Sequence, residues 1–238
     1  MKIVILRGAG GEQGITALGT GDGRWVLVNV SASVAEQLAT GRPALPHPGL
    51  RDADVRAVLL TDAQIEHVGG LLGLRAGAPI DLYATPAVFE DLTTTLPVLP
   101  VLQHYCGVHW RVVPVAGDQN VAAFTVEGMP ELEFTAIATQ VPPQPHAAHG
   151  REPLVGDSIA LAVFDRTTGQ RVFLAPGLQH IGQHELPWVA EADCLLVEQA
   201  DDLLPQLPAR HKVVFGSAGR DLSRWGAEPA FDGMEIEL

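Results

Sequence analysis

The chain has 238 residues, of which 47% are hydrophobic, and it carries a formal net charge of −13. This composition supports one sizeable core, and no stretch approaches the roughly 20 apolar residues that span a bilayer. Because neutralising phosphates requires clustered lysine and arginine, the charge argues against nucleic acid as a partner. We therefore predict one domain over residues 1–238, located in the cytoplasm and without membrane contact.

Short apolar runs predict four strands in the first half of the chain: Lys2–Leu6, Arg24–Val30, Val55–Leu60 and Ile80–Ala84. Apart from Arg56, the run Val55–Leu60 is apolar, as expected of a strand that is covered on both faces. Ser31 or Ser33 can cap a helix over Val34–Ala39 that stops at Gly41. A further helix is predicted to open at Thr85-Pro86, with proline in its first turn.

The second half is rich in strands. Its apolar runs are Arg111–Val115, Val121–Val126, Leu132–Ile137, Ser158–Asp165, Arg171–Leu174, Cys194–Glu198 and Lys212–Phe215. Several of these runs follow one another without an intervening helix. This order favours an α/β protein with two packed sheets and helices outside them over a Rossmann sheet.

The polar segment after Val55–Leu60 is the strongest candidate for a functional site. Asp62, Gln64, Glu66 and His67 fall within six residues at the end of a buried strand, where α/β proteins carry functional side chains. Carboxylate and imidazole groups suit zinc, iron or manganese, whereas glutamine more often forms hydrogen bonds. The alternative is structural: Asp62 caps the next turn, Glu66 is solvated and His67 packs in the core.

Two further histidines, His180 and His184, have the spacing of one helical face. A surface helix is the simpler interpretation of this pair. The two cysteines, Cys106 and Cys194, are far apart in sequence and exclude a disulfide framework.

Short segments from one end of the chain to the other resemble a known family. They are Trp25–Asn29, Leu60–Ile65, Glu90–Thr94, His104–Gly107, Ala175–Leu178, Ala192–Val197 and Asp232–Leu238. Together they are similar to the pyrroloquinoline quinone (PQQ) biosynthesis protein B family of the metallo-β-lactamase superfamily. The resemblance implies an αββα sandwich, in which two mixed β-sheets pack face to face with helices outside.

The resemblance also implies a metal position. The superfamily pattern His-x-His-x-Asp-His aligns with Asp62, Gln64, Glu66 and His67, and the quinone family already has Asp and Gln at the first two places. Glu66 is therefore a departure, although a carboxylate there can still bind a metal. We expect Glu66 and His67 to hold one iron or another divalent metal, with Asp62 beside them.

A metal centre takes about three protein ligands, so the aligned pair needs a third. By the resemblance, His146 and His149 lie in the chain region where the superfamily places another metal histidine. Glu198 follows a predicted strand and is the other candidate. Gln64, His104 and Tyr105 are the candidates for substrate binding, and no catalytic residue is predicted.

Three departures make the chain a shortened and divergent relative of that family. The loop Gly10–Gly14 lacks the family's cysteine cluster, so no structural zinc site is expected. The family's long insertion after Glu198 is missing. Its distal histidine is replaced by Gly216.

Three functions follow from these observations. The resemblance implies a role in making PQQ or a related peptide-derived metabolite, with iron-dependent hydroxylation of a tyrosine-derived intermediate. The missing ligands favour a degenerate member that serves as a binding, carrier or partner subunit. Its partners would be a small-molecule or peptide-derived intermediate and a pathway protein. Metal-dependent hydrolysis is the weakest of the three, because it needs more ligands than the chain offers.

Overall fold

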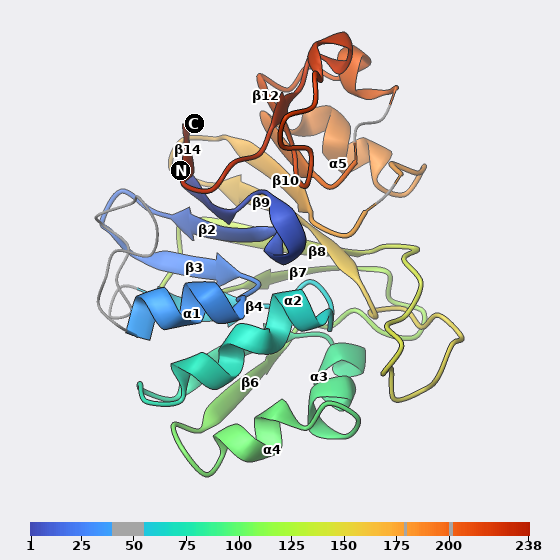
Figure 1. Cartoon of the computed structure of the whole chain (residues 1–238). Helices are drawn as coiled ribbons and strands as arrows, with labels where there is room; N and C mark the ends of the chain where they lie inside the picture. Colours follow the sequence, from blue (N-terminus) through green and yellow to red (C-terminus); the bar gives the residue numbers. More distant parts are fainter. Residues whose placement is uncertain (40–54, 179, 200–201) are drawn as a thin grey trace.

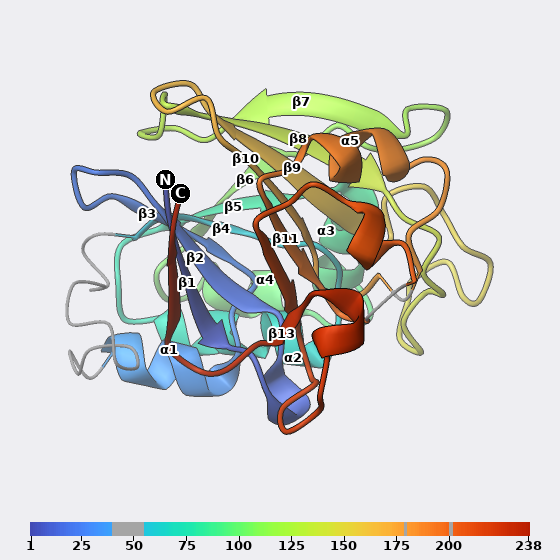
Figure 2. The same ribbon diagram turned by 90° about the horizontal axis from the view of Figure 1, so that it is seen from above.

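The computed structural model describes residues 1–39, 55–178, 180–199 and 202–238, and within them two seven-stranded sheets face each other (Figures 1 and 2). The predicted helix stop at Gly41 lies outside the described residues. Helices cover the outer faces of the sheets, so the αββα sandwich predicted from the resemblance is confirmed. Among the described helices, none combines the length and apolar character that crossing a bilayer requires.

The first sheet has the strand order β14-β1-β2-β3-β4-β5-β6. Its strands are β1 (Lys2–Arg7), β2 (Ile15–Gly19), β3 (Trp25–Val28), β4 (Val55–Leu59), β5 (Ile80–Ala84), β6 (Val108–Val112) and β14 (Met234–Glu237). Pairing is antiparallel from β14 to β3 and parallel from β3 to β6. The carboxyl ends of its parallel strands therefore meet at one edge of the sheet.

The second sheet has the order β13-β12-β11-β10-β9-β8-β7. Its strands are β7 (Val121–Thr125), β8 (Leu132–Ala138), β9 (Ile159–Asp165), β10 (Arg171–Ala175), β11 (Cys194–Val197), β12 (His211–Val214) and β13 (Glu228–Pro229). It is antiparallel from β7 to β10 and parallel from β10 to β13. Both sheets thus combine an antiparallel half with a parallel half.

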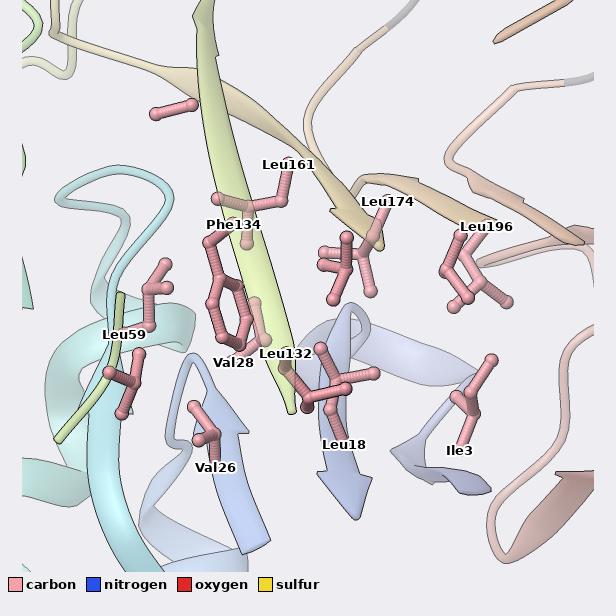
Figure 3. Close-up of a cluster of buried hydrophobic side chains, with 14 of the residues drawn as sticks. Ile3, Leu18, Val26, Val28, Leu59, Leu132, Phe134, Leu161, Leu174 and Leu196 are labelled. Carbon is pink, nitrogen blue, oxygen red and sulfur yellow. The ribbon is translucent and has the colours of Figure 1, made fainter. Parts of the chain in front are cut away.

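The main core lies between the sheets (Figure 3). Leu18 and Val28 come from the first sheet, and Phe134 and Leu161 come from the second; all four side chains are fully buried. Because both inner faces are apolar, the two sheets exclude water from this layer.

Helices cover the outer faces. The first sheet is covered by α1 (Ala32–Ala39), α2 (Ile65–Val68), α3 (Pro86–Thr93) and α4 (Val98–Leu102), and α5 (Leu186–Glu191) covers the second. Two predicted helix starts are confirmed. Ser31 Oγ accepts a hydrogen bond from the Val34 amide at α1, and Thr85 Oγ1 accepts one from the Val88 amide at α3.

Some predicted elements were wrong or missed. Strands β2 and β14 and helices α4 and α5 were missed, because they are short and β2 is buried throughout, with no polar alternation. The strand predicted at Arg111–Val115 begins earlier, at Val108, and ends before Pro114, which has no amide hydrogen to donate.

The predicted surface helix at His180 and His184 is also wrong. Both residues lie before α5, which begins at Leu186. The Glu185 carboxylate accepts a hydrogen bond from the Gly182 amide at 2.9 Å, which stabilises a turn in this segment instead.

Candidate functional site

Five loops from both sheets meet at one edge of the sandwich. They are the β1–β2 loop with Gln13, the segment after β4 with Asp62 and His67, and the loops after β10, β11 and β12 with Pro176, Glu198 and Gly216. Four of these loops follow parallel strands at their carboxyl ends, where α/β folds place functional side chains.

Asp62 organises the segment after β4. Its Oδ1 accepts a hydrogen bond from the Gln64 amide at 2.9 Å and lies 2.7 Å from Nδ1 of His67. Its Oδ2 accepts a hydrogen bond from the Thr61 hydroxyl at 3.0 Å. Asp62 therefore fixes the turn that leads into α2 and aims the imidazole of His67.

Asn29 supports this turn from the end of β3. It adopts a left-handed backbone conformation with φ 62°, which asparagine tolerates better than most residues. Its amide side chain accepts a hydrogen bond from the Thr61 amide at 3.0 Å and donates one to the Thr61 hydroxyl at 2.9 Å. Sequence analysis missed this residue, although an asparagine directly after a buried strand was a visible signal.

His67 is held between two acceptors. Nδ1 faces the Asp62 carboxylate, and Nε2 lies 3.2 Å from the backbone carbonyl of Gln13. The side chain is almost completely buried. Because a carboxylate and a carbonyl can only accept, both nitrogens must donate, and the geometry fits the protonated imidazolium.

In this pair, the charge on each residue stabilises the charged form of the other. Burial opposes a charged imidazole, but the Asp62 carboxylate and its hydrogen bond outweigh burial and raise the pKa of His67. Burial likewise opposes a charged carboxylate at Asp62, yet His67 and the hydrogen bonds from Gln64 and Thr61 lower its pKa. The two residues thus form a buried ion pair.

Gln13 closes the middle of the site. Its Nε2 donates to Glu198 Oε1 at 2.9 Å, while its carbonyl faces His67. Gly216, where the resemblance places the lost distal histidine, lies against the same amide, and any side chain at 216 would collide with it. Gln13 therefore fills the space into which a side chain at 216 would project. Sequence analysis did not single it out, because only the fold brings this loop to the strand ends.

Glu198 lies at the border of two hollows. A small cavity of about 240 Å³ is lined by Gly10, Gly11, Gln13, Gln64, Glu66, His67, Pro176, Glu198 and Phe215. A wider hollow of about 800 Å³ shares Glu198 and includes Ser217, Arg220 and Trp225. Burial raises the pKa of Glu198, although the charge of His67 and the bond from Gln13 act in the opposite direction.

The structure brings only part of the predicted metal set together. Glu66, His67 and Glu198 line the same small cavity, and Asp62 lies behind His67. Glu66 is exposed and has no hydrogen bond or ion pair to any residue that the structure describes.

The predicted loop histidines lie elsewhere. His146 donates from Nε2 to the Ala63 carbonyl at 3.0 Å, and His149 pairs with Asp157 at 3.1 Å. His146 thus reaches the backbone of the segment after β4, and His149 is held in the loop before β9, but neither imidazole has a contact with His67 among the described residues.

The predicted substrate-binding residues are also separated. Gln64 lines the small cavity. His104 and Tyr105 are exposed and follow α4, close to Gly107, whose carbonyl accepts a hydrogen bond from Ile80 at the start of β5. Since the candidate site lies at the carboxyl ends of the parallel strands, His104 and Tyr105 lie toward the opposite edge of the first sheet.

These residues do not fit a metal as they are arranged. Over residues 1–39, 55–178, 180–199 and 202–238, no three or more histidine, cysteine, aspartate or glutamate side chains form a group that could hold an ion. The geometry at His67 gives the reason, because a histidine ligand must be neutral and present a lone pair. Both of its nitrogens are directed at protein acceptors instead.

Known protein families and sequences were compared with this chain. Residues 24–216 match the family model of a beta-lactamase superfamily domain. Coenzyme PQQ synthesis protein B of Klebsiella pneumoniae (strain 342) is 41% identical over 90% of this chain and 82% of its own length. The protein of that name from Methylococcus capsulatus is 32% identical over 96% of this chain and 88% of its own length.

Other relatives match over a smaller part of their length. The Methylobacillus flagellatus protein of the same name is 38% identical over 73% of this chain, and this match spans 56% of that relative. The chain thus covers little more than half of that protein.

Two solved structures share the fold. Zn(2+)-bound PqqB from Methylobacterium extorquens superposes with a TM-score of 0.75 at 21% identity, over 100% of both chains. Human tRNase Z, short form, gives a TM-score of 0.64 at 14% identity, over 100% of this chain and 99% of that one. At such identities the likeness shows the fold alone.

Proposed function

This chain belongs to the coenzyme PQQ synthesis protein B family of the β-lactamase superfamily, and we propose that it acts in PQQ biosynthesis as a binding member whose metal position is closed by its own residues. The identity to full-length relatives supports the pathway. The geometry around His67 supports the binding role over metal chemistry. The cytoplasm is its predicted location.

The proposal of a metal-free role rests on the contacts of Gln13. Gln13 supplies the acceptor for Nε2 of His67 and the donor for the Glu198 carboxylate. Two groups that could have faced an ion are therefore partnered by the same residue. A metal could enter only if these contacts broke, and the Asp62–His67 ion pair would then lose the hydrogen-bond partner that Gln13 provides.

The wider hollow beside Glu198 is the proposed binding surface. It lies next to the segment where the family insertion is missing, and it presents Ser217 and Arg220 beside Trp225. The Arg220 side chain has no hydrogen bond or ion pair to a described residue. A small-molecule or peptide-derived intermediate with both a planar and an anionic part suits this combination.

Iron-dependent hydroxylation of a tyrosine-derived intermediate is the competing function. The observation in its favour is that Glu66, His67 and Glu198 line one cavity. It requires Gln13 to leave the site, so that His67 can present a neutral nitrogen. No step of that reaction follows from the present arrangement.

Metal analysis combined with genetic complementation separates the two functions. The protein is purified anaerobically from iron- and zinc-replete cells, and its metal content is measured by mass spectrometry. Expressed in a strain that lacks the gene, the Glu66→Ala variant should restore PQQ output as well as the wild type does, because Glu66 has no described partner. Glu90→Ala, an exposed glutamate on α3, is the matched control.

We expect far less than one equivalent of metal and full complementation by both variants. One equivalent of iron or zinc that Glu66→Ala removes, together with the loss of PQQ output, would establish the metal enzyme instead. Failure of the wild-type gene itself to restore PQQ output would overturn the pathway role.

A further inference from the structure

A separate cavity lies over the end of β8, away from the contacts of His67. It has a volume of about 630 Å³ and is enclosed by the end of β8, the start of β7 and the loop of residues 139–155. Small-molecule sites typically have volumes of roughly 300–1,000 Å³. Its size is therefore that of a site for a small organic ligand.

The walls of this cavity are mainly apolar. Val121 and Leu154 line it and are 42% and 47% exposed, which leaves apolar surface in contact with water. Pro142, Pro143 and Pro153 complete the wall. Prolines carry no amide hydrogen and have a fixed backbone angle, so they present a stiff surface without donors. An apolar body can displace water from such a wall at a gain in free energy.

Two polar groups in this wall are left without partners. Arg151 lines the cavity and forms no ion pair or hydrogen bond with any residue in the described part of the chain. The Thr139 hydroxyl is buried and likewise has no partner there. Arg151 is exposed, so its guanidinium is free to meet a ligand that enters the cavity. A buried hydroxyl without a partner costs free energy.

We propose that this cavity binds a small carboxylic acid with an aromatic or branched aliphatic body. The carboxylate pairs with the guanidinium of Arg151, whose planar fork matches two carboxylate oxygens. The body packs against Leu154 and the prolines. A phosphate ester fits less well, because Arg151 is the one lysine or arginine among the lining residues.

A neighbouring hollow adjoins this cavity. It has a volume of about 360 Å³ and shares Gln140, Val141, Pro142 and His184 with the proposed site. The two hollows therefore lie side by side, next to the segment before α5. This inference rests on the cavity alone and does not depend on the role proposed for the region around His67.

Calorimetric titration with phenylpropionate tests the proposal. The wild type should bind this acid, and phenylpropanol, which has the same body without the charge, should bind about tenfold more weakly or worse. Arg151→Gln should lose a similar factor of about ten for the acid and little for the alcohol. Arg210→Gln is the matched control, since Arg210 is exposed and does not line this cavity.

A second variant tests the apolar wall. Leu154→Asp places a negative charge where the body should lie and should abolish binding of the acid. Leu72→Asp, at another exposed leucine, should leave binding unchanged. Circular dichroism of each variant confirms that it is folded. The proposal is overturned if the wild type binds neither probe, or if Arg151→Gln and Arg210→Gln bind the acid equally well.

Discussion

The region around His67 and the cavity at Arg151 both lie on loops that follow strands, but they differ in how their polar groups are partnered. At His67, the imidazole, the Asp62 carboxylate and the Gln13 amide all bond to one another or to their neighbours. At Arg151, the guanidinium and the Thr139 hydroxyl have no described partner. A cluster with satisfied hydrogen bonds stabilises the fold, whereas an exposed, unpaired charge beside apolar surface, such as Arg151, is available to a ligand.

In this chain, the segment that aligns with the superfamily's metal pattern has a structural role. Asp62 and His67 remain at the expected strand end, but they now form a buried ion pair that joins β4 to the β1–β2 loop. Removing one member of such a pair leaves the other charge buried.

Replacement of His67 by alanine should have the largest effect. It leaves the Asp62 carboxylate buried without its counter-charge, and we expect the free energy of unfolding to fall by about 3 to 5 kcal/mol. Urea denaturation followed by circular dichroism measures the loss. Glu66→Ala, one residue away but exposed, should change stability by less than about 0.5 kcal/mol. Equal stability of the two variants would contradict a structural role for the pair.

The pH dependence of stability probes the same pair without mutation. The pKa of His67 is raised above its ordinary value of 6.5, so its contribution is complete below that pH and is lost as the pH rises through the folded-state pKa. The pKa of Asp62 is lowered below 3.8, so its contribution is present above that pH and is lost as the pH falls through the folded-state value.

The urea midpoint of the wild type should therefore be highest between about pH 3.8 and pH 6.5 and decline on both sides. The double variant Asp62→Asn, His67→Gln serves as the comparison. Its profile should be flatter over the same range. If both profiles have the same shape, other groups set the pH dependence and the pair does not.

Gly216→Ala tests whether Gln13 closes the site. Gly216 and Gly219 both adopt a left-handed backbone, with φ 63° and φ 77°, but only Gly216 lies against the Gln13 amide. Alanine at either position should cost about 1 to 2 kcal/mol of backbone strain. At 216 the collision should add about 1 kcal/mol or more.

The difference between these two alanine variants in urea unfolding isolates the contact. Gln13→Ala should cost less stability in the Gly216→Ala background than in the wild type, because both substitutions act on the same contact and are therefore not additive. Similar values for Gly216→Ala and Gly219→Ala would show that Gln13 does not fill this space.

Two threonines give the smallest predicted effects and the sharpest contrast between the regions. Thr61→Val removes a hydroxyl that bonds to Asn29 and Asp62, and it should cost about 1 to 3 kcal/mol. Thr139→Val removes a buried hydroxyl without a described partner, so it should leave stability unchanged or raise it by up to about 1 kcal/mol. Thermal and urea unfolding of both variants check the ranking. A larger loss for Thr139→Val would mean that its hydroxyl is satisfied in the folded protein.

The sequence by itself determined the two-sheet architecture and the position of the polar segment. Mainly apolar runs such as Val55–Leu60, in which Arg56 is the one charged residue, predict buried strands, because burial on both faces leaves little place for polar residues. The N-terminal starts of α1 and α3 were also predictable, since Ser31 and Thr85 act through residues three positions away. Short elements such as β14 were missed because a few residues carry too little pattern to mark them.

Only the tertiary structure decided how the candidate site is partnered. Gln13 lies 54 positions from His67 and 185 from Glu198 in the sequence, and the packing of the two sheets brings the three together. The unpaired state of Arg151 is likewise a property of what the fold places around it. Local patterns determine which segments are buried, whereas the partners of a buried polar group depend on contacts between distant segments that no local pattern encodes.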